Sequence, residues 1–524
     1  MRHFASSPSL TVSSDAAPAP ALTRRAALAR ALALGASGAG GAGLAGLGAA
    51  LLAPSNAAAI PARRAVAAPV PAQAGAALLR ACGLPMTSIG AYVCEIDGGA
   101  PLVAVNPESS YAMASTTKVV TSLAALDLLG VNFRWRTFAF LRGPLLEGTL
   151  LGDLLILGGG DARLTSAELR QWFGELRAQG LHRIAGDIVL DRCAFALSES
   201  DFANTPPPTT GRAYHVRPDA FAIDEGLLHV AVEPGKGGQA AVSVEPPLAG
   251  VQVVNRVSMR GGCTATARLA DETGTPRLSV QGSWSPACGR RELSIVPTAP
   301  AAFTTRALAG LWAEAGGELS GTVVERTRAD AASPIPAGPD GTPALPWSVH
   351  VSDPLPVVLH DMNKTSDNLT ARHLMLAFTR GFPLRPATMS EAQERMNEWL
   401  AHQGIAEGDI AVENGSGLSR GERAKPRALA QLLTRAWHAP RRQAFLDSLP
   451  VAGVDGTLEH RMQGTAAEGR AFLKTGTLID TRALAGYVSA ASGRTYAVAL
   501  MVNHPGAARA TPALDRFIEW LART

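Results

Sequence analysis

The chain has 524 residues, which is too long for one compact core, and its 47% hydrophobic content can fill two to four domains. Its formal net charge is +4, and we find no block of like charge that could follow a nucleic-acid backbone. We therefore expect no nucleic-acid partner.

The first sixty residues are typical of an export signal. Thr23-Arg24-Arg25 precedes a weakly apolar run of Ala, Leu and Gly at residues 31–52, and small residues follow at 55–59. We expect residues 1–59 to be a signal peptide and the protein to lie in the periplasm or cell envelope. The paired arginines favour a twin-arginine signal, but the Ala-Ala-Leu after them keeps the general secretory route open. A permanent anchor is the alternative.

Export makes the cysteines informative, because disulfides persist outside the cytosol. The odd number of five cysteines leaves at least one thiol unpaired. Cys263 and Cys288 flank a strand-rich stretch and are the first pair that we expect to be bonded. Neither a CxxC nor an HExxH spacing is present, so we expect no metal and no cofactor.

The first predicted elements are a hairpin and a helix. Residues 87–105 predict two short strands around a turn at 97–101. Apolar residues then recur at helical spacing from Ser115 to Leu129, and Gly130 follows them. We predict a helix over residues 115–129.

The predicted secondary structure changes near residue 137, and short strands dominate from there. Residues 150–157 and 184–190 predict strands on either side of a helix at 167–179. Further short strands are predicted at residues 227–232, 241–244, 251–257 and 278–282. We interpret residues 137–345 as two inserted β-rich domains. The proline-rich residues 327–347 predict a linker or a long surface loop.

The C-terminal part is mostly helical. Helices are predicted at residues 355–362, 368–378, 389–402, 428–436 and 513–522, with strands at 483–490 and 496–502. Strands at both ends of the chain predict one α/β domain. Its halves, residues 76–136 and 346–524, are separated by the insert, and residues 60–75 link it to the signal peptide.

Ser115 and Lys118 open the first predicted helix as the sequence Ser-Thr-Thr-Lys. Residues three apart share a helix face, so we expect the Ser115 hydroxyl and the Lys118 amine within hydrogen-bonding reach. A buried lysine can lose its proton and take one from the serine, which arginine cannot do. The lysine is informative because only five of the 48 basic residues are lysine. An ordinary helix cap is the alternative.

Ser366-Asp367-Asn368 lies just before another predicted helix. In an extended turn residues two apart point the same way, so we expect Ser366 and Asn368 to present a hydroxyl and an amide together. A simple helix N-cap by Ser366 or Asp367 is the alternative.

Lys474-Thr475-Gly476-Thr477 predicts a strand. Thr475 and Thr477 are expected on one face, and Lys474 and Gly476 on the other. Gly476 would leave the strand edge bare for the backbone of a substrate. An edge strand with a solvated lysine is the alternative.

The three motifs SxxK, SxN and KTG each occur once, in this order, at residues 115–118, 366–368 and 474–476. Together they resemble the active-site signature of penicillin-binding proteins and serine β-lactamases. The spacing between the first two motifs, 251 positions from Ser115 to Ser366, is long. In this it resembles the D-alanyl-D-alanine carboxypeptidase/endopeptidase family, the class C low-molecular-mass penicillin-binding proteins of peptidase S13 type. Stretches such as GDLLILGGGDARLT at 152–165, GSGLSR at 415–420 and PVAGVDGTL at 450–458 extend the resemblance over about residues 75–524.

The resemblance implies a β-lactamase/transpeptidase-like fold, with an antiparallel sheet between helices and inserted β-rich domains. It also implies a serine DD-peptidase that acts on peptidoglycan peptides and is inhibited by β-lactams. Ser115 would form the acyl-enzyme and Lys118 would be its base. Ser366 would relay the proton to the leaving amine, and Asn368 would hold the substrate amide or orient Lys118.

Substrate binding follows from the same resemblance. Lys474 would attract the terminal carboxylate and help keep Lys118 neutral, and the hydroxyls of Thr475 and Thr477 would contact that carboxylate. The backbone N–H groups of Ser115 and Thr477 would form the oxyanion hole. We retain a homodimer as an alternative to a monomer.

The chain departs from the family pattern at three places that concern the side chain of the peptide. Arg372 and Asn414 stand where members often have an acidic residue, and residues 205–211 contain none. Two other functions remain as alternatives: a β-lactamase or esterase of the same fold, and a non-catalytic wall-binding protein. The GxSxG match at 417–421 is interpreted as a loop, because Gly421 and Pro426 delay the next helix.

Overall fold

The computed structural model describes residues 72–204, 213–270, 276–326, 342 and 344–524. The predicted signal peptide, and most of the proline-rich stretch at 327–347, lie outside the described residues. Within the described part, no helix is both long enough and apolar enough to span a bilayer.

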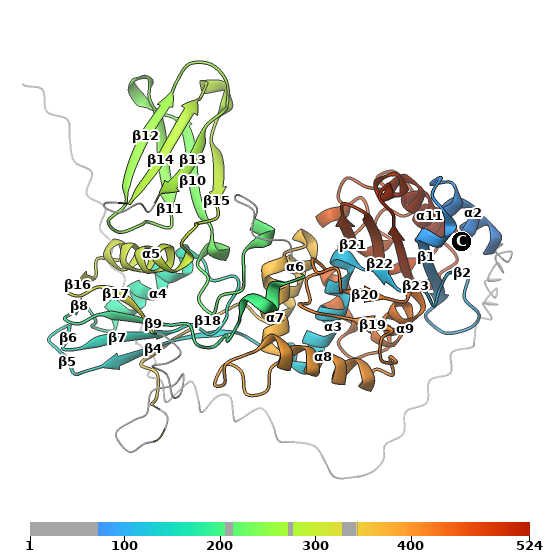
Figure 1. Cartoon of the computed structure of the whole chain (residues 1–524), viewed down its shortest axis with the longest axis horizontal. Helices are drawn as coiled ribbons and strands as arrows, with labels where there is room; N and C mark the ends of the chain where they lie inside the picture. Colours follow the sequence, from blue (N-terminus) through green and yellow to red (C-terminus); the bar gives the residue numbers. More distant parts are fainter. Residues whose placement is uncertain (1–71, 205–212, 271–275, 327–341, 343) are drawn as a thin grey trace, which may run out of the picture. The chain divides into compact units, whose positions relative to one another are not determined.

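A five-stranded antiparallel sheet joins the two ends of the chain (Figure 1). Its strands, in spatial order, are β2 (Val103–Val105), β1 (Ile89–Glu95), β23 (Thr495–Asn503), β22 (Thr481–Ser489) and β21 (Ala471–Leu478). β1 pairs with β23 along its whole length, from Ile89 opposite Val502 to Glu95 opposite Tyr496. The strands predicted at both ends of the chain, and the single sheet they form, are confirmed. β21, with the KTG motif, is an edge strand.

Helices cover both faces of this sheet, because its side chains alternate between two hydrophobic cores. On one face, α2 (Ala72–Arg80) and α11 (Thr511–Arg523) pack against residues such as Leu484 and Val498. On the other face, Ala483 and Ala485 join the larger core. That core includes the helices α3 (Thr117–Leu128), α6 (Leu355–Thr365), α7 (Asn368–Ala377), α8 (Met389–His402), α9 (Pro426–Trp437) and α10 (Arg442–Ser448). The predicted layers are confirmed; α10 was not predicted.

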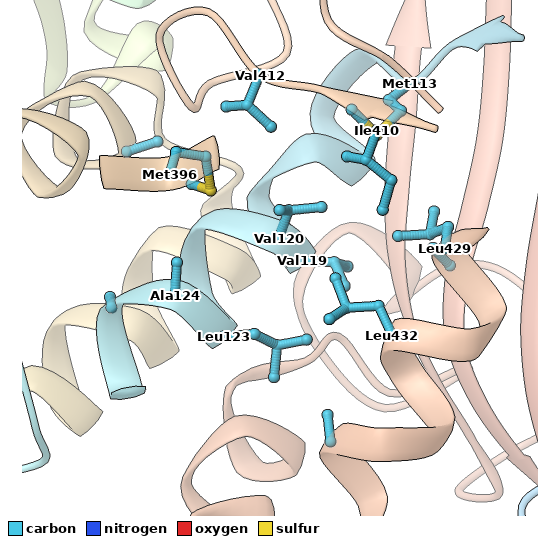
Figure 2. Packing of buried hydrophobic residues seen from close by; sticks show 14 of the residues in the cluster. Met113, Val119, Val120, Leu123, Ala124, Met396, Ile410, Val412, Leu429 and Leu432 are labelled. Atoms are coloured by element: carbon cyan, nitrogen blue, oxygen red, sulfur yellow. The ribbon is translucent and has the colours of Figure 1, made fainter. Parts of the chain in front are cut away.

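The helix that follows the SxxK serine is buried all round. Every residue of α3 from Thr117 to Leu126 is buried. Figure 2 shows Val119, Val120 and Leu123 of α3 among side chains of α8, α9 and β19 (Ile410–Ala411). Packing from several sides holds the start of α3 in place, which a positioned nucleophile requires.

The first part of the insert is a mixed sheet with two helices. Its strands, in spatial order, are β17 (Val323–Arg326), β9 (Ile188–Asp191), β7 (Asp153–Leu157), β4 (Arg136–Arg142) and β18 (Ser348–Val351). A smaller sheet contains β16 (Glu318–Leu319), β8 (Arg183–Ile184), β6 (Thr149–Leu150) and β5 (Leu145–Leu146). The helices are α4 (Ser166–Ala178), as predicted, and α5 (Pro300–Glu314), which was not.

Two predicted strands of this region are broken. The runs at 150–157 and 184–190 each divide into two strands that belong to different sheets. The break in the first run falls at Gly152, where φ is +158° and an added Cβ would lie 2.0 Å from the carbonyl oxygen of Arg142. The second breaks at Gly186, where the Cβ would lie 2.3 Å from the carboxylate of Asp153. The two glycine turns lie against each other, so the apolar runs could not continue as single strands.

The second part of the insert has its own hydrophobic core. One sheet contains β11 (Ala240–Glu245), β10 (Leu228–Pro234) and β15 (Arg291–Ile295). The other contains β12 (Gln252–Ser258), β14 (Arg277–Ser283) and β13 (Thr266–Ala270). The two sheets share one cluster of buried residues. The predicted disulfide Cys263–Cys288 is present beside it.

Candidate active site

Ser115 lies in a tight turn ahead of α3. Residues Ala114–Thr116 form one turn of 3₁₀ helix, and the α-helix begins at Thr117, two residues later than predicted. Ala114 has a φ of +46°, which is rare for a residue with a side chain and is found where the surrounding structure fixes a strained backbone. This turn places Ser115 in the wall of a cleft of about 580 Å³.

Lys118 connects the nucleophile to two other parts of the site. Its Nζ lies 3.1 Å from Ser115 Oγ, 2.6 Å from Asn368 Oδ1 and 2.5 Å from the carbonyl oxygen of Ser416. The predicted contact between serine and lysine is therefore present. Asn368 and Ser416 accept two N–H bonds, so a neutral amine directs its lone pair at the Ser115 hydroxyl.

The environment of Lys118 weakens its hold on its proton. Burial lowers the pKa of Lys118 to about 7, against the attraction of the carboxylates of Asp367 and Glu422, and the guanidinium of Arg372 also lowers it. Its side chain is fully buried. Near neutral pH, a large fraction of Lys118 is thus the free amine that a base must be.

Ser366 and Asn368 flank the cleft from the junction of α6 and α7. Ser366 ends α6 in the left-handed region with a φ of +63°, so the predicted extended turn is wrong at this residue. A left-handed residue is a common way to end a helix. Asp367 caps α7 by accepting the N–H groups of Leu369 and Thr370 at 3.0 and 2.8 Å. Capping is thus the role of Asp367, while Ser366 and Asn368 line the cleft with Ser115.

Lys364, near the end of α6, stabilises this junction through an ion pair with Asp455. Its Nζ lies 2.7 and 2.6 Å from the two carboxylate oxygens of Asp455, and it donates to the carbonyl oxygen of Leu449 at 2.7 Å. The ion pair joins the end of α6 to the 450–458 stretch. Lys364 is therefore a structural contact of the SxN turn.

Lys474 is buried rather than solvated. Its Nζ donates to Ser366 Oγ at 2.9 Å and to the carbonyl oxygen of Thr475 at 3.1 Å. Burial and the positive charge of Lys118 hold the pKa of Lys474 well below its usual value. The SxN serine therefore contacts one amine, and the SxxK serine the other.

The remaining residues of the KTG strand have different surroundings. Gly476 packs on the nucleophile turn, because an added Cβ would lie 2.6 Å from the carbonyl oxygen of Met113. The turn that precedes Ser115 therefore occupies the space that a side chain at position 476 would need. The Thr475 hydroxyl donates to Thr457 Oγ1 at 2.8 Å, whereas Thr477 is exposed and lines the cleft.

The loop at 413–421 contains Ser416, whose carbonyl oxygen accepts a hydrogen bond from Lys118 Nζ. The buried carboxylate of Glu422 stabilises this loop. Glu422 accepts the backbone N–H groups of Asn414, Gly415 and Gly417 at 3.0, 2.7 and 2.6 Å. Burial raises the pKa of Glu422, and these three bonds oppose the rise. Sequence reasoning missed Glu422, since an isolated Glu beside Arg residues usually lies on the surface. The segment is a loop, as predicted, and its Ser419 is buried.

Gly417 gives a test of how this loop holds the nucleophile. It has a φ of +86°, and a Cβ would lie 2.0 Å from the carbonyl oxygen of Ala114, next to Ser115. We expect Gly417→Ala to lower the free energy of unfolding by about 1–3 kcal/mol and to slow acylation of Ser115, because the nucleophile turn must move.

The matched control is Gly464→Ala, which has a φ of +69° but no atom within 4 Å of the added Cβ. It carries the backbone strain without the clash, so acylation should keep its normal rate. Urea unfolding and the rate of penicillin labelling measure the two effects. Equal losses in both variants would contradict a special role for Gly417.

The cleft is also lined by residues outside the three motifs, among them Tyr214, His215, Arg420 and Arg482. Asn368 Nδ2 donates to the carbonyl oxygen of Tyr214 at 3.3 Å, which fastens the insert segment to the SxN helix. One turn later on α7, Arg372 Nη1 donates to the carbonyl oxygen of Val216 at 2.8 Å. No motif in one sequence could have placed this segment here, because the contact joins residues more than 150 positions apart.

Arg372 is a buried cation at a position where the sequence departs from the family pattern that it resembles. Its side chain is 1% exposed, and within the described residues Nε and Nη2 have no hydrogen-bond partner. Burial lowers the pKa of Arg372 to about 10, against the attraction of Glu422 and Asp367. It therefore remains charged at neutral pH and acts on Lys118 as a fixed positive charge.

The chain is similar to known proteins over most of its length. The sequence model of the D-Ala-D-Ala carboxypeptidase 3 (S13) family matches residues 73–524. A D-alanyl-D-alanine carboxypeptidase of Actinomadura sp. (strain R39) is 30% identical over 445 residues, which are 80% of this chain and 77% of that protein. The D-alanyl-D-alanine carboxypeptidase DacB of Haemophilus influenzae is 26% identical over 425 residues, 80% and 85% of the two chains.

Solved structures show the same relationship. The crystal structure of penicillin binding protein 4 from Haemophilus influenzae is similar with a TM-score of 0.67 and 25% identity, over 84% of this chain and 97% of that one. The same protein complexed with a β-lactam gives a TM-score of 0.62 at 25% identity, over 83% and 95%. The chain we describe belongs to the D-Ala-D-Ala carboxypeptidase 3 (S13) family.

Proposed function

We propose that this protein is a serine DD-peptidase that hydrolyses the bond after a D-alanine in peptidoglycan stem peptides through an acyl-enzyme on Ser115. The observation that carries the proposal is the 3.1 Å contact between the Ser115 hydroxyl and the buried amine of Lys118 in the wall of the cleft. Membership of the family and the names of its relatives give the substrate class.

In the acylation step, Ser115 Oγ attacks the carbonyl carbon of the D-alanine. The hydroxyl proton passes to the lone pair of Lys118 Nζ, whose other hydrogens bond to Asn368 and Ser416. The backbone N–H groups of Ser115 and Thr477 stabilise the oxyanion as it develops. Loss of one such donor typically costs about 10²–10³ in rate.

The leaving amine then needs a proton. Lys118 holds the proton taken from Ser115, and Ser366 lies on the same cleft wall with its Oγ 2.9 Å from Lys474 Nζ. Ser366 passes its own hydroxyl proton to the amine and regains the proton that Lys118 holds, so Lys118 returns to the neutral amine. The C–N bond breaks, and water later releases the acyl group from Ser115.

The carboxylate of the leaving residue meets the Thr477 hydroxyl, which is the exposed one of the two motif threonines. Thr475 bonds to Thr457 and supports the strand. Lys474 has a lowered pKa in the free protein, and the negative charge of an entering carboxylate raises it again. Substrate binding thus supplies the positive potential expected of Lys474.

Incubation with purified muropeptides tests this function. We expect the protein to release D-alanine from pentapeptides, or to cleave the D-amino-acid cross-link of dimers, with both products read by mass. The Ser115→Ala variant should release neither. Unchanged muropeptides after incubation with the wild-type protein would contradict the proposal, and the ratio of the two products separates carboxypeptidase from endopeptidase action.

We also propose that the protein is exported and works in the periplasm or cell envelope. The charged, apolar and small-residue pattern of residues 1–59 supports export. The mass of the protein recovered from the cell envelope tests this: cleavage near residue 59 is expected, and recovery of the intact chain from the cytoplasm would contradict it.

A further inference from the structure

Two arginines line the cleft, and they differ in their partners. Arg420 pairs with Asp480 at 2.5 Å, and both side chains are about half exposed. Arg482 makes no ion pair with any carboxylate of the described residues. Of the two arginines in the described cleft lining, it is therefore the one without a carboxylate partner.

The sheet places Arg482 beside a residue of the KTG motif. Arg482 lies on β22 directly opposite Thr477 of β21. Side chains of directly opposite residues leave the sheet on the same face, with Cβ atoms about 4.5–5.5 Å apart. Both residues line the cleft that contains Ser115. A guanidinium and a hydroxyl are thus presented side by side next to the nucleophile.

The guanidinium of Arg482 is fixed by two hydrogen bonds, and two of its nitrogens still have N–H groups to donate. Arg482 Nη1 donates to the carbonyl oxygens of Leu478 and Thr481 at 2.7 and 2.8 Å, which fixes it over the turn between the two strands. Within the described residues these bonds use Nη1, and Nε and Nη2 keep their N–H groups for another acceptor. A planar carboxylate matches such a pair of donors.

Lys474 adds positive potential but does not line the cleft, so direct contact with the carboxylate is left to Arg482. Among the described residues that line the cleft there is no aspartate or glutamate. Lys474 is fully buried and its amine is engaged with Ser366. An incoming carboxylate therefore meets Arg482 before any other unpaired cation of the described cleft wall.

We propose that Arg482, together with the Thr477 hydroxyl, binds the carboxylate of the residue that leaves when Ser115 attacks. This inference rests on the proposed function, because it assigns the recognition of the leaving residue to a side chain outside the three motifs. It makes Arg482 a specificity-determining residue: the enzyme selects substrates whose leaving residue carries a free carboxylate next to the scissile bond.

The test compares two peptides, one ending in D-Ala-D-Ala as the free acid and one ending in the carboxamide. For the wild-type protein, kcat/KM should favour the acid. Arg482→Gln should lower kcat/KM for the acid by about 10- to 100-fold, as expected for the loss of charge-assisted hydrogen bonds, and leave the amide unchanged. Arg420→Gln is the matched control: it removes the other cleft arginine, and the acid-to-amide ratio should stay at the wild-type value.

Three results would overturn the proposal. The first is an unchanged kcat/KM for both peptides in Arg482→Gln. The second is an equal fall for both peptides, which indicates a structural role in the turn. The third is a wild-type enzyme with no preference for the acid. Arg482→Lys adds a second variant that keeps the charge but loses the planar pair of donors, so it should recover part of the acid rate. Penicillin labelling of Ser115 distinguishes a failure of this inference from a failure of the proposed function. A wild-type protein that is not labelled would refute the proposed function itself.

Discussion

Lys118→Arg is expected to slow acylation of Ser115 by about 10²–10⁴-fold, the usual contribution of a positioned general base. Arginine keeps the positive charge but does not release its proton at any usable pH, so it cannot accept the proton of the Ser115 hydroxyl. The measurement is the second-order rate of labelling by a fluorescent penicillin, with urea unfolding to show that the variant is folded.

Two further variants complete this experiment. Lys236→Arg makes the same change at an exposed lysine outside the cleft and should label at the wild-type rate. Lys118→Met removes the amine without adding bulk, and it should be as slow as Lys118→Arg. A Lys118→Arg protein that labels at the wild-type rate would show that another group takes the proton.

The rate of acylation is expected to fall as the pH drops through about 7, because the lowered pKa of Lys118 leaves the amine protonated below that value. Arg372→Gln should move this midpoint to higher pH. Removal of the buried cation leaves the carboxylates of Asp367 and Glu422 less opposed, and negative charges favour the protonated lysine.

The direction of the shift distinguishes an electrostatic effect from a general structural loss. Glu422→Gln removes a negative charge near the same amine, so its midpoint should move to lower pH. Arg380→Gln removes a surface cation that pairs with Glu398 and should leave the profile unchanged. A lower rate with the same midpoint in Arg372→Gln would mean that Arg372 acts only through its bond to Val216.

Much of the catalytic domain could be predicted because the apolar residues of its helices and strands recur at clear intervals. The apolar stripe of α3 and the two long apolar strands β22 and β23 are each typical of one kind of element. The order of SxxK, SxN and KTG then indicated which distant segments meet, and the contacts of Lys118 with Ser115 and Asn368 agree with it. The catalytic role of each side chain stays a prediction until the variants are measured.

The rest could not be predicted, since it depends on how the chain closes on itself. The apolar run at 150–157 conceals the break at Gly152, because the glycine is forced by a neighbouring turn rather than by the run itself. Glu422 and Arg372 are charged residues that a single sequence places on the surface, and the fold buries both beside Lys118. Arg482 has no local signal at all; only the register of β22 against β21 brings it to Thr477.

Covalent labelling of Ser115 tests most directly whether this serine is the nucleophile. The purified protein is incubated with a fluorescent penicillin, and the adduct is located by the masses of the intact chain and of its peptides. We expect one adduct per chain on the peptide that contains Ser115, and none in Ser115→Ala. An adduct that persists in Ser115→Ala, or one located on another serine such as Ser366 or Ser419, would contradict it.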